Sequence, residues 1–201
     1  MDLKTEILRE HSKRQAVKIA NWIGPDKRRF RELMELFLKG EYRVTQRSAW
    51  IVGCCADRYA FLIAPWLGAM IKRMQEPGAH PAVKRNVVRI LQFVEIPDSL
   101  LGSVVTLCFK YLDSANEPIA VRVLSMTVLL NASQIEPDLR NELKSMIELM
   151  LPNAEPAIQS RARMVLKRLQ KRVNNGKGRK KLLSTVPRDR STLNDVEDSH
   201  S

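Results

Sequence analysis

The sequence predicts an all-α protein, an α-α superhelix in the form of a right-handed α-solenoid of stacked helical hairpins. A pattern first seen at Arg14 recurs four times: a basic or small polar residue is followed by apolar or small residues at positions +2, +5, +6 and +9. A fixed period in this range is typical of stacked helical units. The chain also has only 8 glycines and 10 prolines, and the prolines lie between periodic segments, which favours helices throughout. The five copies of the pattern start at Arg14, Arg47, Arg85, Arg122 and Ser160, which are 33 to 38 residues apart.

Each copy marks one helix, which we call an inner helix, because its four apolar positions form a narrow stripe at 100° per residue. The periodic segments between the copies are expected to be outer helices, so the chain should contain nine helices. No segment reads as a convincing strand. The expected inner helices span about 2–23, 42–57, 81–95, 118–134 and 156–173. The expected outer helices span about 25–39, 59–76, 98–113 and 137–151.

Glycine, proline and helix-capping residues support these boundaries. Gly24 and Pro25 should end the first helix, because glycine tolerates a helix C-cap and proline cannot continue the hydrogen-bond ladder. Asp98 is expected to be the N-cap of its helix, and Pro137 suits the first turn of the next outer helix. Prolines also occur four residues before three of the pattern starts, at Pro81, Pro118 and Pro156.

Two stretches of the chain resemble HEAT repeats, namely LIAPWLGAMIKRMQEPGAHPAVKRNVVRILQFV and EPIAVRVLSMTVLL. In that family an outer helix often has a proline near its start, here Pro65, and a basic residue opens the inner helix after a short turn. The resemblance covers residues 1–173 as one domain of about four and a half HEAT-like hairpins. It implies a curved solenoid with the inner helices on the concave face. Residues 174–201 lack a periodic apolar face, and we expect them to form a basic, disordered tail.

The charge of the chain suggests an acidic partner. The formal net charge is +12, with +5 in residues 1–31, −1 in residues 32–160 and +8 in residues 161–201. The inner helices are more basic than the outer ones, so the concave wall should carry a positive field. We therefore expect a non-catalytic scaffold that holds an acidic protein, peptide or polyanion in a basic groove. The expected partner-binding residues are Arg14, Lys18, Arg47, Arg85, Arg89, Arg122 and Lys167.

Two alternatives to this hypothesis stay open: the arginines can have a structural role, or the partner can be nucleic acid. The arginines at the pattern starts can be architectural, bonding to a neighbouring turn or helix end, as such residues commonly do in HEAT-like units. Met126 and Met164 are expected to add adaptable apolar contacts to the groove. The partner can also be nucleic acid, since basic residues crowd the last helix and continue into the tail. The candidate nucleic-acid-binding residues are Arg161, Arg163, Arg168, Lys171 and Arg172.

A more distant resemblance is to the HEAT-like alkylpurine DNA glycosylases. In those enzymes a basic concave face with tryptophans and a carboxylate holds duplex DNA. Here Trp50 lies on an inner helix, but the residue one turn later is Cys54 rather than aspartate, so the catalytic pattern is not reproduced. We therefore expect no enzymatic activity from this chain.

Composition and spacing argue against several other functions. The chain has no glycine-rich phosphate loop and no nucleophile elbow, and no pair of its three histidines has metal-ligand spacing, so we expect no cofactor and no metal. Its longest uncharged runs, such as residues 59–71, are too short to span a membrane. Its three cysteines suit reduced thiols in the cytoplasm, where we expect the protein to reside. The oligomeric state stays open.

Overall fold

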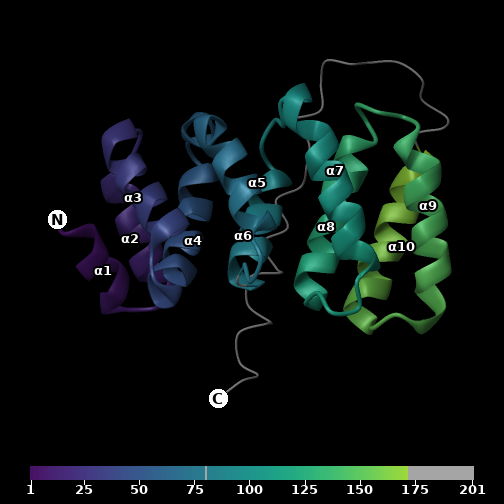
Figure 1. The fold of residues 1–201 in the computed structure, drawn as a ribbon, viewed down its shortest axis with the longest axis horizontal. Helices are drawn as coiled ribbons and strands as arrows, with labels where there is room; N and C mark the ends of the chain where they lie inside the picture. The colour runs from purple at the N-terminus through teal and green to yellow at the C-terminus, as the bar shows by residue number, and fades with distance from the viewer. Residues whose placement is uncertain (80, 172–201) are drawn as a thin grey trace.

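The computed structural model describes residues 1–79 and 81–171, with only the backbone of Lys171. Within these ranges the regular structure is entirely helical, and the helices alternate between an inner and an outer layer of an α-solenoid (Figure 1). The all-α superhelix expected from the repeat is therefore confirmed. The expected tail at residues 174–201 lies outside the described residues.

The described helices follow the predicted order. A short additional helix, α1 (Leu3–Arg9), packs against α2, α3 and α4 at the N-terminal end. The inner layer consists of α2 (Lys13–Ile23), α4 (Tyr42–Ala56), α6 (Pro81–Leu91), α8 (Ile119–Ala132) and α10 (Pro156–Lys171). The outer layer consists of α3 (Lys27–Lys39), α5 (Leu67–Gln75), α7 (Asp98–Asp113) and α9 (Leu139–Met150). A single 3₁₀ turn, η3 (Leu151–Asn153), follows α9.

The prediction of one helix over residues 2–23 is wrong, because the chain breaks between α1 and α2. Glu10 adopts an extended conformation, and the Ser12 side chain accepts a hydrogen bond of 3.1 Å from the backbone N–H of Gln15. Serine caps helices well because its hydroxyl satisfies an N–H that the first turn leaves free. The Gln15 side chain in turn donates to the Glu6 carbonyl at 2.8 Å and holds the two short helices together. The described chain therefore has ten α-helices rather than nine.

The outer helix expected at residues 59–76 is also shorter than predicted. It begins with two 3₁₀ turns, η1 (Ala60–Leu62) and η2 (Ala64–Trp66), before α5 starts. Pro65 lies in η2, where it has no N–H to donate. At α7, Pro97 is the N-cap residue instead of the expected Asp98, and at α9 Pro137 lies in the turn before the helix.

The inner layer is more closely packed than the outer one. Each inner helix packs against the next, from α2 through α4, α6 and α8 to α10. In the outer layer α3 touches α5, whereas α5 and α7, and likewise α7 and α9, make at most marginal contact. Since helices stack more tightly on the inner side, the inner layer forms the concave wall.

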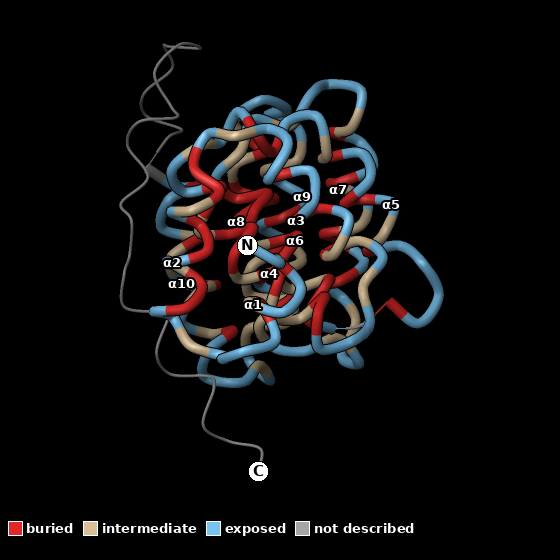
Figure 2. The backbone as a smooth tube through the Cα atoms, turned by 90° about the vertical axis from the view of Figure 1, so that its left-hand side faces the viewer, coloured by how far each residue is buried: buried red, intermediate tan, exposed pale blue. Residues whose placement is uncertain are grey.

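The core lies between the two layers, as the view from the N-terminal end shows (Figure 2). Phe30, Leu33 and Phe37 of α3 are fully buried there. Burying a side chain of this kind stabilises the fold by about 1.5–3 kcal/mol. A hairpin alone has no second surface to cover such residues, so stacking of neighbouring repeats supplies their burial.

Candidate functional site

Arg47, one of the predicted partner-binding residues, is tied to the end of a neighbouring helix. Its Nη1 donates to the carbonyl of Leu8 at 2.7 Å and lies 3.4 Å from that of Ile7, both in the last turn of α1. The last carbonyls of a helix have no partner within the helix, and a cation there also complements the helix dipole. Arg47 therefore links α4 to α1.

Arg122 makes an equivalent link two repeats further on. Its Nε donates to the Leu112 carbonyl at 3.2 Å near the end of α7, and its Nη1 lies 3.7 Å from Glu155 Oε2. Only 11% of its side chain is exposed. Arg161 is similar, because its Nη1 donates to Thr127 Oγ1 of α8 at 2.8 Å. The guanidinium groups of these residues bond to neighbouring helices and loops, as the architectural alternative expects.

Arg14 and Lys18 lie at the N-terminal end with exposed side chains. Arg14 pairs with Glu10 at 3.5 Å, and Lys18 pairs with Glu6 at 3.3 Å. Hydrogen bonds from Gln15 and then from Lys18 hold the pKa of Glu6 below its usual value. The Arg14–Glu10 pair is exposed and contributes little to stability, so Arg14 stays available to an external anion, whereas Lys18 is paired with a carboxylate that is only 16% exposed.

Arg85 and Arg89 differ from every other half-buried cation in the described part of the chain. They lie one turn apart on α6, in the middle of the inner layer, and neither guanidinium group makes a hydrogen bond or ion pair with a described residue. Like charges at this helical spacing repel each other. The other half-buried cations all have a partner; they are Arg47, Arg73, Lys84, Arg122, Arg140 and Arg161.

More positive charge reaches this region from α2 and from the turn after α4. Cys54 of α4 is half-buried, and burial raises the pKa of its thiol, as does the charge of Asp57. The charges of Arg89, Arg58 and Lys13 oppose that increase, so all three act on the same thiol. Arg58 also donates from Nη1 to Asn21 Oδ1 of α2. We call Lys13, Arg58, Arg85 and Arg89 the cationic cluster.

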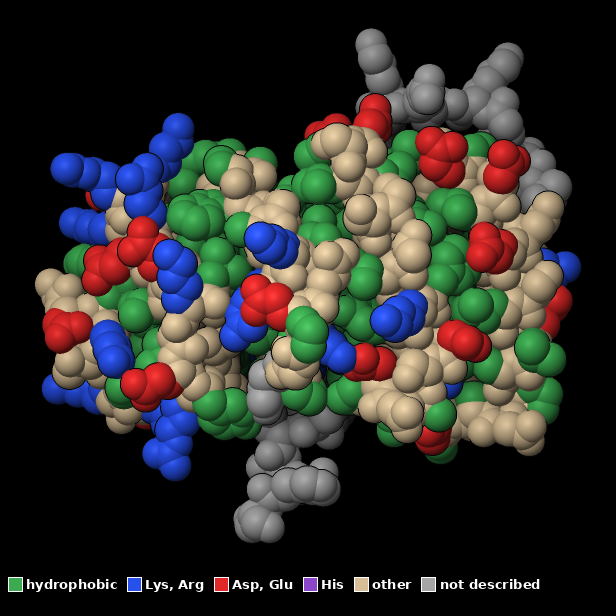
Figure 3. Space-filling view, viewed as in Figure 1, with side chains coloured by type: hydrophobic (Ala, Val, Ile, Leu, Met, Phe, Trp, Pro, Cys, Tyr) green, Lys and Arg blue, Asp and Glu red, His purple; other side chains and the backbone are tan. Residues whose placement is uncertain are grey.

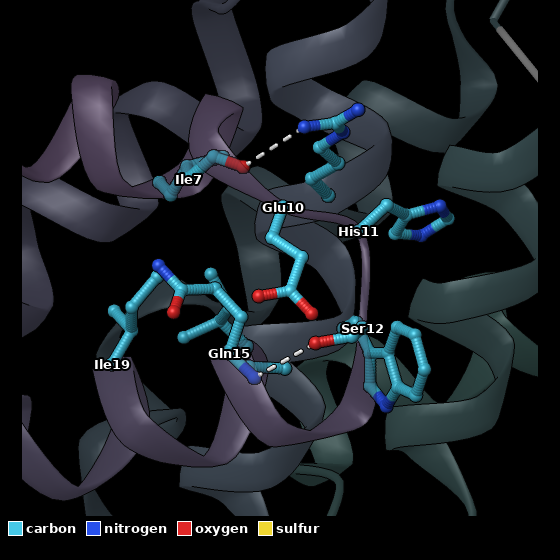
Figure 4. Close-up of a pocket in the computed structure, with 10 residues that line it drawn as sticks. Ile7, Glu10, His11, Ser12, Gln15 and Ile19 are labelled. Atoms are coloured by element: carbon cyan, nitrogen blue, oxygen red, sulfur yellow. Dashed lines mark hydrogen bonds between the residues drawn. The ribbon is translucent and has the colours of Figure 1, made fainter.

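A small hollow adjoins this region between α1, α2 and α4 (Figure 4). Arg47 reaches across it to the Ile7 carbonyl, and Glu10 points toward Ser12 (Figure 4). The Ser12 hydroxyl is the main cause of the lowered pKa of Glu10. The ring of His11 meets Trp50 edge-on, with 5.6 Å between ring centroids. Most polar groups around the hollow are engaged in these internal contacts. We therefore interpret the hollow as part of the junction between α1, α2 and α4 rather than as a ligand site.

The candidate nucleic-acid residues on α10 fall into two groups. Arg161 is engaged with Thr127, whereas Arg163 is exposed and donates from Nη2 to Gln159 Oε1 at 3.0 Å. Arg168 is exposed, and so is Lys167 from the partner-binding set. The side chain of Lys171 and all of Arg172 lie outside the described residues.

The expectation that Met126 contacts a partner is wrong, because its side chain is fully buried. The helix that carries it, α8, is enclosed by α6, α7, α9 and α10, and therefore has little free surface. Met164 is half-buried. Lys13 and Arg58 were missed by the repeat pattern, because neither stands at a repeated position. Their positions at helix ends, at the start of α2 and just after α4, are the feature of the sequence that could have identified them.

Within the described residues, no group of histidine, cysteine or acidic side chains is arranged to hold a metal ion. Among residues 1–79 and 81–171, no helix has the length and apolar character needed to cross a lipid bilayer.

The cationic cluster can be tested through Cys54. We expect Asp57→Asn to increase the alkylation rate of Cys54 at pH 8 severalfold, because losing the nearby negative charge lowers the thiol pKa and raises the thiolate fraction. Arg58→Gln should slow the same reaction, since Arg58 favours the thiolate. The rates are measured by peptide mapping with iodoacetamide. Cys55 and Cys108, whose pKa burial raises to about 12, serve as slow internal controls. Equal Cys54 rates in both variants would contradict the placement of these charges.

Comparison with known proteins agrees with the architecture. The family model of the HEAT repeat domain matches residues 3–169, which includes α1 and nearly all of α10. No curated protein and no solved structure matches the chain. HEAT repeats are helical-repeat scaffolds that generally mediate protein interactions and are typically non-catalytic. With most of its length matched by the family model and its helices stacked in two layers, the chain belongs to the HEAT repeat family.

Proposed function

We propose that the protein is a non-catalytic scaffold that holds an acidic segment of a partner protein against its concave wall. The observation that supports this proposal is the pair Arg85 and Arg89, two half-buried residues whose guanidinium groups have no acceptor in the described part of the chain. Partly removing a charge from water without pairing it is unfavourable. A ligand that brings carboxylates to these groups would offset that cost.

The chemistry of the cationic cluster suits carboxylates. A guanidinium group presents its N–H donors in a planar fork that matches the two oxygens of a carboxylate. Lys13 and Arg58 add positive charge from two further segments of the inner layer. Charges of one sign that line a concave wall also raise the local concentration of an oppositely charged partner.

Nucleic acid is the second candidate, supported by the exposed cations Arg163, Lys167 and Arg168 on α10. It has less support, because Arg161 from the same helix is engaged with Thr127 and the unpaired arginines lie two inner helices away. The two candidates differ in salt dependence. A track of phosphate contacts should give a steep loss of affinity with salt, whereas an acidic peptide held by a few arginines should give a shallow one.

The test is the double variant Arg85→Gln, Arg89→Gln. We expect it to bind a fluorescein-labelled glutamate-rich peptide at least tenfold more weakly than the original protein, measured by anisotropy at 50 and 200 mM NaCl. A labelled DNA duplex is titrated in parallel. Thermal stability should stay the same or rise, because the change removes a repulsive pair from α6.

The matched control is Lys72→Gln, Lys110→Gln, which removes the same charge from exposed positions on α5 and α7. It should change peptide affinity less than twofold. Equal losses in the two double variants would mean that net charge rather than the concave wall holds the peptide. Tighter binding of the duplex with a steep salt slope would favour the nucleic-acid candidate.

A further inference from the structure

One edge of the solenoid collects the turns that lead from inner to outer helices. The inner helices run in the same direction, so the turns after α2, α4, α6 and α8 all lie along the top of the molecule in Figure 1. We call this surface the turn edge and define it by residues 24–31, 59–61, 92–98 and 133–138. It shares no residue with the cationic cluster.

Three successive turns of this edge each expose a large apolar side chain. Phe61 is 54% exposed, Phe93 is 45% exposed and Ile135 is 43% exposed. Phe61 meets Tyr59 edge-on, with 6.3 Å between ring centroids, which fixes part of this surface in place. A row of exposed aromatic and aliphatic side chains is typical of a surface that another protein covers.

The charges of the turn edge change sign along its length. Exposed cations without an ion pair in the described residues crowd its N-terminal end; they are Lys27, Arg28 and Arg31. Exposed carboxylates, equally without an ion pair there, mark its third and fourth turns; they are Glu95, Asp98, Glu136 and Asp138. Figure 3 shows this division, with lysine and arginine at the upper left and aspartate and glutamate at the upper right.

A surface with one basic half and one acidic half is complementary to itself when one copy is reversed. In an antiparallel pair about a twofold axis, each basic end meets the acidic end of the other copy, and the apolar turns meet in the middle. In a parallel pair, like charges would face each other. A second copy of the chain therefore satisfies the charge pattern and the apolar row together.

The size of the edge indicates how tight this contact can be. Four turns spaced by the usual 8–10 Å between packed helices give a strip about 30 Å long. With a width of two helices, about 20 Å, each copy would bury about 600 Å². The total of about 1,200 Å² is at the low end for specific interfaces, which suits a reversible dimer.

We propose that the protein forms an antiparallel homodimer through the turn edge, with Phe61 of one copy close to Phe93 of the other. The dimer leaves both concave walls free for partners. It does not depend on the function proposed above, and variants of the turn edge should bind the glutamate-rich peptide as the original protein does.

The first measurement is sedimentation velocity of the full chain between 1 and 200 µM at 50 and 500 mM NaCl. We expect reversible dimerisation that weakens at least fivefold at the higher salt concentration, because opposite charges meet at both ends of the interface. Phe61→Ser with Phe93→Ser should shift the chain to monomer with only a small decrease in its melting temperature, since about half of each side chain is exposed. A chain that stays monomeric at 200 µM and low salt would overturn the proposal.

A charge exchange gives the sharper test. Arg28→Glu with Arg31→Glu makes both ends of the edge acidic, and Glu95→Lys with Glu136→Lys and Asp138→Lys makes both ends basic. Each variant alone should be monomeric, whereas an equimolar mixture should form a heterodimer. The mixture cannot regain dimers in this way if the contact lies elsewhere on the molecule. Dimers that persist in each variant alone would therefore exclude the antiparallel arrangement.

Discussion

Arg122→Met is expected to lower the free energy of unfolding by about 2–3 kcal/mol. The change removes the donor to the Leu112 carbonyl and the cation beside Glu155, while methionine retains much of the apolar contact that the arginine stem makes. A buried carbonyl left without a donor loses more than the modest net value of a hydrogen bond, because it was already removed from water. The cost should appear as a lower midpoint in urea.

Arg85 provides a matched control, because it occupies the same repeat position one unit earlier and has no described acceptor. Arg85→Met should change the free energy of unfolding by less than about 0.5 kcal/mol. Urea unfolding of the two variants, followed by circular dichroism, measures the difference directly. If both variants lose the same stability, the two arginines have the same role and the division into structural and available cations fails.

Gly40→Ala should destabilise the protein by about 2–3 kcal/mol, the range expected for an overpacked site. A Cβ at this position would clash with the Leu36 carbonyl and lie 2.9 Å from Val44 Cγ1. Neither atom can retreat easily, because the Leu36 carbonyl accepts the Gly40 N–H at 3.0 Å and Val44 is buried. The junction between α3 and α4 is thus closed to even one additional methyl group.

Gly102→Ala is the control for this substitution. Gly102 is exposed on α7, and nothing lies within 4 Å of the position that a Cβ would occupy. Alanine there should stabilise the protein by about 0.5–1 kcal/mol, because glycine is a poor helix former. Thermal unfolding of both variants should therefore give shifts of opposite sign. A Gly40→Ala variant as stable as the original would show that α3 and α4 can separate at little cost.

Much of the fold could be predicted from the period of the sequence. Pattern positions such as Val87, Ile90 and Leu91 are buried as the period predicts. In the weaker copy at Arg122, however, two of the four, Leu124 and Asn131, are only half-buried. The break between α1 and α2 was not predicted, because its cause is a single cap at Ser12 within a segment whose apolar spacing continues. Local hydrogen bonding therefore breaks the continuous helix over residues 2–23 that the apolar period predicts.

The candidate site was less predictable, for a reason that its arginines make clear. Arg47, Arg85 and Arg122 occupy one repeat position, but Arg47 bonds to a carbonyl 39 residues away and Arg122 to one 10 residues away, while Arg85 has no described acceptor. The sequence gives the position of the donor within its helix. The acceptor depends on where another helix ends, and the repeat does not encode that.

The two layers of the solenoid are packed unequally, so the inner layer is continuous while the outer helices are largely independent of one another. A wider or narrower arc would move α5, α7 and α9 apart or together against few contacts between them, whereas the stack from α2 to α10 is continuous. If the concave wall holds a partner segment as proposed above, a change in curvature would tighten or loosen that hold without the loss of any helix.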